Sequence, residues 1–498
     1  MSNRSRIVGL VLLVVFATWW SVRGCTRQPE VRQSQPTVAR ETFRFDRPVQ
    51  VEVIATRLPN GAAAETDWLE LELRRALLRP ALRIAPAGQG DSAREAFLLR
   101  IAVAPDFRQV SLALVAPDQI LEREQTILFK DSARSAIARS LAAEIPKFLG
   151  APTPADASVL PGLDDPNGYE IYTRAAVDLL GADGAGFTQP PAEPSLTRTV
   201  ERLEALTRSR PRFARAWALL ALAYLGLGGE DEISLTELAK ESAERAAALD
   251  GTIADAHAAL GLAALRRNEW TAAHEQLRTA LMIDPHSAPA LEGLACLFTD
   301  AGLYRTARTF ASRAVALQPR SLGANEYLAY ASEGAPVETA PHSAAAQILA
   351  LRTLLNGDAP GAAHALRDAL RPAQFDLWAQ PLLLAIGDAR RTPAALRAIT
   401  RAASDGQIAP YTEIVCGAGL RQADFVLNRI ARLQRKGVQA PLRILWLPQT
   451  AFLRRHARFK DVIGASGLSA FWQENGLPDV CASESAVYGC AMKEAKNR

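Results

Sequence analysis

Small and apolar side chains recur in the middle of the chain at an interval of 34 residues. Gly251, Pro285 and Pro319 mark this interval, each lying 34 residues from the next. The small residues at matching slots between them are Gly261 and Ala295, Ala273 and Ala307, and Ala280 and Ala314. Two helices can cross closely at such slots, because a larger side chain would not fit. Each proline then ends a second helix, since it lacks an N–H and disfavours helix at the preceding residue.

The same frame extends upstream of Gly251. Trp217, Leu220, Ala221 and Tyr224 follow the pattern W-x2-L-G-x2-Y, with Ala221 in the glycine slot. This pattern and the period resemble the tetratricopeptide repeat, a helix-turn-helix unit. The resemblance implies an α-solenoid with a binding surface, in which each repeat needs its neighbours to bury its apolar face. An unspecified helical bundle is the alternative, which the repeated slots disfavour.

The repeats are expected to span residues 166–372. A weaker unit containing Tyr169 opens the array, and an insertion at Gly226–Ile233 delays the second helix of the next unit. A degenerate unit at Ala344–Arg371 closes the array. The predicted fold class is therefore mostly α, a tetratricopeptide α-solenoid preceded by a small α+β domain and an N-terminal membrane anchor or signal helix.

Residues 45–150 follow a different periodicity. Val49, Val51 and Val53 alternate with polar residues, which indicates a half-buried strand. Leucines in 68–78 predict a helix, and the apolar face of 133–148 predicts a second one. The further strands are expected at 82–85, 97–103, 110–115 and 120–129. The predicted order is β-α-β-β-β-β-α, an α+β domain.

This order of elements resembles the amino-terminal domain of TolB and the related FlgO-type domain. In those relatives a strand and a helix lead into a meander of strands, and a helix then introduces tetratricopeptide repeats. The resemblance rests on the order of elements and on no sharp motif. Another small α+β sandwich is the alternative.

The first 25 residues form a separate segment, 1–25, followed by a polar linker, 26–44. Ile7 to Trp20 is apolar apart from Gly9 and Thr18, and Ser21 and Val22 extend the run to about sixteen residues, close to the roughly 17 to 25 residues that a spanning helix needs. Three interpretations remain open: an uncleaved anchor through residues 7–22, which we favour, a cleaved signal peptide, and a lipoprotein signal ending at Cys25. In a bacterium, each places the bulk of the chain outside the cytoplasm.

Five cysteines occur in the chain. Cys296 falls inside the first helix of a repeat, where a buried core thiol is expected. Cys481 and Cys490 lie close together in a loop-like stretch and can form a disulfide in an oxidising compartment, or remain unbonded. No C-x-x-C motif is present, and the histidines never pair at helical spacing, so neither a zinc site nor another metal site is expected.

The carboxy-terminal region, 373–498, carries a further set of motifs. Leu445–Pro448 contains a Trp with a nearby Pro, Phe471–Trp472 follows, and Pro478–Cys481 reads Pro-Asp-Val-Cys. Together with the anchor and the TolB-like domain, these motifs resemble the extracytoplasmic half of bacterial CadC-type regulators and of membrane adenylate cyclases that contain tetratricopeptide repeats. Phe471 replaces the tyrosine of that pattern. The resemblance implies a sensory or scaffold half without a cytoplasmic output domain.

Catalytic signatures do not appear in the sequence. The chain contains no G-x-x-x-x-G-K-[ST], no H-E-x-x-H and no G-x-S-x-G motif. The net charge of +4 is too small to argue for nucleic acid. We therefore expect no enzyme, no cofactor and no nucleic-acid partner.

Polar residues on the first helices are the candidates for partner contacts in the repeat groove: His257, Glu292 and Asn325. Trp270, in the turn between two helices, is either an anchor at the groove rim or a cap of the core. The hypothesis is a periplasmic scaffold or sensor, anchored in the inner membrane, that binds a protein or peptide. The alternatives are a self-assembling structural subunit and an envelope enzyme with an unrecognised site in 376–498. Secretion or lipid attachment remains open for the location.

Overall fold

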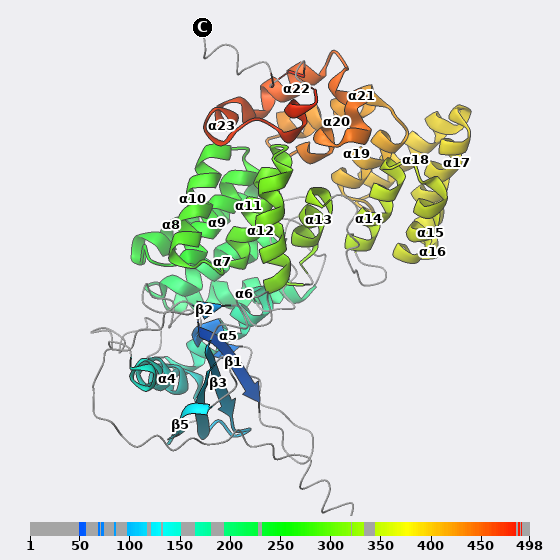
Figure 1. Cartoon of the computed structure of the whole chain (residues 1–498). Helices are drawn as coiled ribbons and strands as arrows, with labels where there is room; N and C mark the ends of the chain where they lie inside the picture. Colours follow the sequence, from blue (N-terminus) through cyan, green and yellow to red (C-terminus); the bar gives the residue numbers. More distant parts are fainter. Residues whose placement is uncertain are drawn as a thin grey trace, which may run out of the picture. The chain divides into compact units, whose positions relative to one another are not determined.

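A computed structural model of the chain is shown in Figure 1. It describes residues 49–55, 68–69, 71–73, 84–85, 97–116, 121–130, 133–150, 165–180, 194–227, 232–319, 321–332, 344–484, 487–488 and 490. The predicted anchor, 1–25, and the predicted linker, 26–44, lie outside the described residues. Among the helices that are described, none has both the length and the apolar character needed to cross a membrane. The chain divides into two compact units, Met1–Ser158 and Val159–Arg498.

The first unit is an α+β unit. Its described elements are β1 (Val49–Ala55), β2 (Ile84–Ala85), β3 (Phe97–Val103), β4 (Gln109–Val115), β5 (Leu121–Leu128) and α4 (Arg134–Leu149). The described strands form one sheet in the order β2-β1-β3-β4-β5. β1 pairs in parallel with β2 and β3, whereas β3, β4 and β5 form an antiparallel meander. β1 lies where the alternating pattern predicted it, and the other described strands fall within or close to their expected ranges.

Apolar positions on alternate residues build the core of this unit. The alternate buried positions of β3 and β4 are Leu99, Ile101, Val103, Val110, Leu112 and Leu114, and Val115 at the end of β4 is buried as well. Ile137, Leu141 and Ile145 are buried on one stripe of α4. Arg123 of β5 donates a hydrogen bond to the carbonyl of Phe148 at the end of α4, at 3.0 Å. The apolar stripe of the helix therefore packs on the apolar face of the sheet.

The second unit is helical. Its repeat helices are α5 (Pro166–Leu180), α6 (Pro194–Ser209), α7 (Ala214–Leu227), α8 (Glu232–Leu249), α9 (Ala254–Arg266), α10 (Trp270–Ile283), α11 (Ala288–Asp300), α12 (Tyr304–Leu317), α13 (Leu322–Ala331), α14 (Ala344–Leu355) and α15 (Ala359–Ala369). The first helices α9, α11 and α13 begin 34 residues apart, and so do the second helices α10 and α12. The helix-pair repeat predicted from the period is confirmed. Part of the predicted insertion, residues 228–231, lies outside the described residues.

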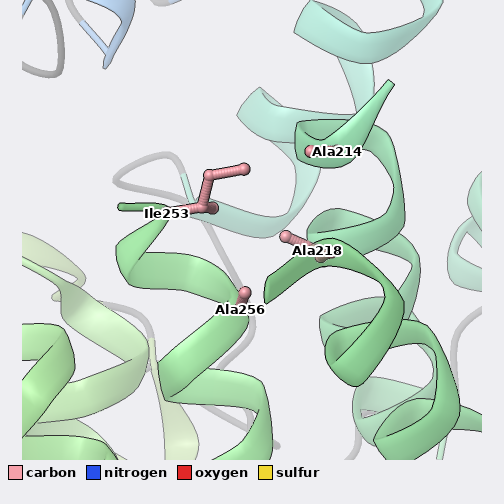
Figure 2. Packing of buried hydrophobic residues seen from close by; sticks show 5 residues of the cluster. Ala214, Ala218, Ile253 and Ala256 are labelled. Carbon is pink, nitrogen blue, oxygen red and sulfur yellow. The ribbon is translucent and has the colours of Figure 1, made fainter. Parts of the chain in front are cut away.

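Small residues bring the helices of each pair together. Ala239, Ala273 and Ala307 stand at one slot of α8, α10 and α12, and all three are fully buried. Figure 2 shows similarly close packing between α7 and the start of α9, where Ala214 and Ala218 face Ile253 and Ala256. The predicted proline boundaries also hold, because α10 and α12 end two residues before Pro285 and Pro319.

The remaining helices continue from the repeats to the carboxy terminus. They are α16 (Pro372–Gln374), η1 (Phe375–Ala379), α17 (Gln380–Gly387), η2 (Ala389–Arg391), α18 (Thr392–Ser404), α19 (Pro410–Gly419), α20 (Ala423–Arg435), η3 (Leu442–Trp446), η4 (Pro448–Thr450), α21 (Ala451–Arg454), α22 (Phe459–Ser466), α23 (Leu468–Asn475) and η5 (Asp479–Ala482). Several of them return to the repeats, since η3 contacts α11 and α23 contacts α10. Figure 1 shows these orange and red elements beside the green repeat helices.

Replacing Gly261 by alanine should destabilise the repeat unit. A Cβ at this position would lie 2.6 Å from Cγ of Leu277 and 3.1 Å from its backbone nitrogen, so the two helices would have to move apart. We expect the free energy of unfolding to fall by about 1–3 kcal/mol, measured by urea denaturation.

The matched control is Gly464→Ala in α22, where no atom lies within 4 Å of the new Cβ. This substitution should raise stability by about 0.5–1 kcal/mol, because alanine favours helix over glycine. Equal behaviour of the two variants would show that the α9–α10 crossing is not limited by space at Gly261.

Candidate functional site

The surface expected to hold a partner is covered by the chain itself. We call residues 438–484 the closing segment. Every residue of α11 is buried, and the closing segment supplies much of the cover. Its contacts reach α10, α11, α12 and α13 from positions more than 100 residues away in the sequence. The part of the repeat array around α11 and α13 is therefore closed.

Arg443 of the closing segment lies between two buried carboxylates. Its Nη1 donates to Oδ1 of Asp300 at 2.9 Å, and its Nε donates to Oε1 of Glu326 at 2.8 Å. Its backbone N–H also donates to Asp300, at 3.0 Å. The guanidinium lies over the rings of Tyr327 and Tyr411, at 5.4 and 4.8 Å from their centres. The side chain is thus fully engaged by charges and aromatic faces.

Charge and burial oppose one another in this cluster. Burial lowers the pKa of Arg443, but Glu326 and Asp300 together raise it well above its usual value. Burial raises the pKa of Glu326, and Arg443 acts against that rise. Without Arg443 the cluster would hold two uncompensated carboxylates away from water, which is costly.

Three tryptophans tie the closing segment to the turns of the repeats. Nε1 of Trp446 donates to the carbonyl of Asp300 at 2.8 Å, and Nε1 of Trp472 donates to that of Ala301 at 3.0 Å. The next residue, Gly302, has φ +78, and a Cβ there would lie 2.8 Å from the Trp446 ring. The turn between α11 and α12 therefore requires glycine both for its backbone angle and for the approach of the indole.

Trp270 takes part in the same junction. Its Nε1 donates to the carbonyl of Ser466 at 2.6 Å, and only 2% of the residue is exposed. Of the two interpretations of Trp270, this burial agrees with a cap of the core and not with an anchor at the groove rim. The indole is directed into the closing segment, which the local sequence around the α9–α10 turn could not indicate.

The end of the closing segment is held by Arg454 and a disulfide. Arg454 donates through Nη1 to the carbonyls of Leu445 and Leu447, and through Nε and Nη2 to the carboxylate of Glu484 at 3.0 and 2.5 Å. The hydrogen bond from Arg454 lowers the pKa of Glu484. Cys481 and Cys490 form a disulfide around this position, so the chain at Glu484 is fixed on both sides.

The other groove candidates serve the repeats themselves. Glu292 is buried and accepts a hydrogen bond at 2.6 Å from Ser321, the N-cap residue of α13. Nδ2 of Asn325 donates to the carbonyls of Pro319 and Ser321, both at 2.8 Å. These positions correct the expectation that polar residues of the first helices here point into an open groove, because both side chains are buried.

His257 belongs to a recurring contact. Its Nε2 lies 3.0 Å from the carbonyl of Gly251, six residues earlier. Trp217 and Asn325 occupy the equivalent slot and donate to the carbonyls of Pro211 and Pro319, again six residues earlier. The slot therefore closes the end of the preceding repeat.

Two free thiols are buried within the described residues, at Cys296 and Cys416. Burial, followed by the charge of Asp300, raises the pKa of Cys296. Burial and Glu413 raise the pKa of Cys416 in the same way. Thiols in such surroundings stay protonated and are poor nucleophiles.

Open hollows remain elsewhere on the helical unit. One of about 400 Å³ lies between α6, α7 and α8 and is lined by Trp217, Leu220, Tyr224 and Leu238 among others. A second, of about 360 Å³, lies between α20 and α22. The first was not singled out from the sequence, although three of its lining residues, Trp217, Leu220 and Tyr224, belong to the repeat signature.

The chain was compared with known proteins. No protein-family model and no curated protein matches it. Among solved structures, a thermophilic TPR protein from Thermus thermophilus is 19% identical with a TM-score of 0.27, covering 40% of this chain and 90% of its own. A structure of Naa15/Naa10 bound to HypK-THB is 15% identical with a TM-score of 0.23, covering 66% of this chain and 50% of its own.

The chain thus spans half the length of the second structure. TM-scores this low carry no argument about function or overall shape. The tetratricopeptide-like arrangement rests instead on the helix pairs and their 34-residue period. The resemblance of residues 45–150 to TolB-type domains, and of the whole chain to CadC-type regulators, stays a prediction.

Replacing Arg443 by methionine should open the closing segment. Asp300 and Glu326 would lose their cation inside the protein, and breaking such a buried pair costs about 3–5 kcal/mol. Urea denaturation should report this loss, and limited proteolysis should cut between α20 and α22. Arg390→Met, at an exposed ion pair with Asp388, is the control and should leave both measurements unchanged.

The loss of unfolding free energy caused by Arg443→Met should depend on pH. Burial already raises the pKa of Glu326, and removal of the cation raises it further. Protonation then removes the buried charge, so the deficit relative to the native chain is largest at high pH and shrinks as pH falls through that raised pKa. A deficit that stays constant between about pH 8 and about pH 5 would contradict the role given to the two carboxylates.

Reduction of the Cys481–Cys490 disulfide should loosen the end of the closing segment. Closing a loop of this size restricts the unfolded chain by about 2–3 kcal/mol. Hydrogen exchange should therefore accelerate at residues 479–484 in the reduced protein, while α9 and α10 keep their protection. Unchanged exchange at Glu484 would show that Arg454 holds this end alone.

Proposed function

We propose that this chain is a non-catalytic protein-binding scaffold or sensor of the bacterial envelope. In this proposal residues 7–22 anchor it in the inner membrane and the bulk lies in the periplasm. The helix-pair array supports the binding role, because stacked repeats present extended surfaces to partners. The buried thiols, with raised pKa values, support a role other than thiol catalysis.

The closing segment covers the later repeats, so the proposed binding surface lies on the first repeats of the array. Around α11 and α13 the first-helix surface is occupied by Arg443 and its neighbours. The first repeats differ, because the hollow between α6, α7 and α8 is open and Leu238 on its wall is 42% exposed. This hollow is the observation that carries the proposal. A partner is expected to bind at α6–α8.

The envelope location has two supports. The apolar run at Ile7–Trp20 precedes a polar stretch, as in an anchor or signal. The disulfide between Cys481 and Cys490 suits an oxidising compartment, because such bonds are rare where thiols are kept reduced.

Site-specific photo-crosslinking in intact cells tests this proposal. A photo-reactive residue placed at Leu238 on α8 should form an adduct with another protein. The matched control is Met282, which lies on the second helix α10 and is 72% exposed, and it should give none. Adducts of equal yield at both positions would contradict a partner surface at α6–α8.

An adduct at Leu238 between two copies of the chain would point to the self-assembling alternative. The readout is the mass of the crosslinked species and the identity of its peptides. The same cells, fractionated before crosslinking, place the chain in the membrane or the soluble fraction. Recovery from the cytoplasm would contradict the envelope location.

A further inference from the structure

Successive repeats build the same groove and fill it differently. Each groove runs between two consecutive second helices and has the intervening first helix as its floor. In the groove of α10, α11 and α12, the ring of Phe310 from α12 stacks on Phe298 of α11, with centres 5.6 Å apart and planes 7° apart. An aromatic ring therefore closes this groove.

The preceding groove, of α8, α9 and α10, is closed by a polar bridge. Gln276 of α10 occupies the slot nine residues before Pro285, as Phe310 does before Pro319. Its Oε1 lies 2.9 Å from Nδ1 of His257 on α9. In both repeats, a long side chain at this slot of the second helix reaches the first helix on the floor of the groove.

Among the residues that the structure describes, none fills the first groove, of α6, α7 and α8, in this way. Nine residues before Gly251 stands Ser242, whose side chain is much shorter than those of Gln276 and Phe310. The hollow of about 400 Å³ lies at this place and is lined by Ser242 itself. Leu238 of α8 forms an apolar wall, and Leu220 of α7 lies on the floor. Tyr224 occupies the floor slot that Phe298 has two repeats later.

The side chain of Tyr224 is fixed in place on the floor of the hollow. Its hydroxyl donates to Glu204 of α6 at 2.8 Å. Burial, and then the hydrogen bond to Glu204, raises the pKa of Tyr224, so the phenol stays neutral. Glu204 is also paired with Arg208, at 3.4 Å. The carboxylate of Glu204 is therefore already bound by both Tyr224 and Arg208.

Two guanidinium groups stand at the walls of the hollow, Arg208 on α6 and Arg245 on α8. Glu241 of α8 also lines it. A guanidinium is attracted to the negative face of an aromatic ring. The volume is ample for a ring, since an apolar cavity of about 150 Å³ already accepts benzene.

We infer that the hollow between α6, α7 and α8 receives an aromatic side chain of a protein partner, which stacks on Tyr224 as Phe310 stacks on Phe298. The inference rests on the proposed scaffold function, because it takes the occupant from another protein. It adds to that function the kind of side chain that the hollow recognises, which is aromatic. Arg208 and Arg245 flank the bound ring.

Selection of peptides tests this inference. A displayed library of random linear peptides is selected on the full chain, and the enriched peptide is labelled with fluorescein for binding measurements. The enriched sequences should share one Phe, Tyr or Trp. Replacing that residue by alanine should weaken binding by about tenfold or more. Enriched sequences without an aromatic residue, or no enrichment at all, would overturn the inference.

Ser242→Phe is the decisive variant, because it copies the residue that fills the groove at Phe310. It should abolish binding of the labelled peptide, whereas Ser242→Ala should bind it like the native chain. If Ser242→Phe does not fold in a thermal melt, Ser242→Gln, which copies Gln276, replaces it and should weaken binding. Full binding by a folded filled variant would overturn the inference.

This result is separable from a failure of the scaffold proposal. Loss of peptide binding in Ser242→Phe together with loss of the Leu238 adduct in cells supports both. A Leu238 adduct that persists in folded Ser242→Phe leaves the scaffold standing and removes the hollow as its recognition site.

Discussion

The guanidinium of Arg443, held between the carboxylates of Asp300 and Glu326, determines how the helical unit is closed. A cation and two anions in a buried site are stable only while all three are present. Asp300 and Glu326 belong to repeat helices, whereas Arg443 arrives from a distant part of the chain. The repeats and the closing segment therefore depend on one another. The repeats bury two carboxylates that need the cation of Arg443, and Arg443 is buried and needs those carboxylates.

Two kinds of position have different structural roles inside the repeats. Slots such as Ala273 and Ala307 are small so that helices can approach, and they are fully buried. The slot of Trp217, His257 and Asn325 is larger and closes the preceding repeat through its carbonyl. Side chains that look like candidates for recognition in a single repeat thus have a structural task when several repeats are compared.

Much of this fold could be predicted from the sequence, since period, small residues and prolines are local signals. The alternation around Val49 located the first strand in the same way. The docking of the closing segment could not be predicted. Trp270 and Ser466 are 196 residues apart, and the local sequence around either residue gives no sign of the contact. Glu292 and Asn325 were misplaced in an open groove for another reason, because both bond to residues of the repeats around Ser321.

A closer comparison of the repeats would have found the hollow. Ser242, Gln276 and Phe310 stand at one slot of three repeats, and the change from long to short side chain is visible in the sequence. The sequence could not show that the described part of the closing segment stays away from the hollow. That depends on where the closing segment ends, and its contacts reach α10 to α13.

The order of synthesis gives the closing segment a further meaning. The repeats are made first, and Asp300 and Glu326 leave the ribosome more than 100 residues before Arg443 does. Until then, the growing chain holds an acidic, unclosed face that water can reach. A truncated or stalled product would keep that face exposed and would be recognisable to proteases as unfinished. Closure of this face therefore waits until the closing segment has been made.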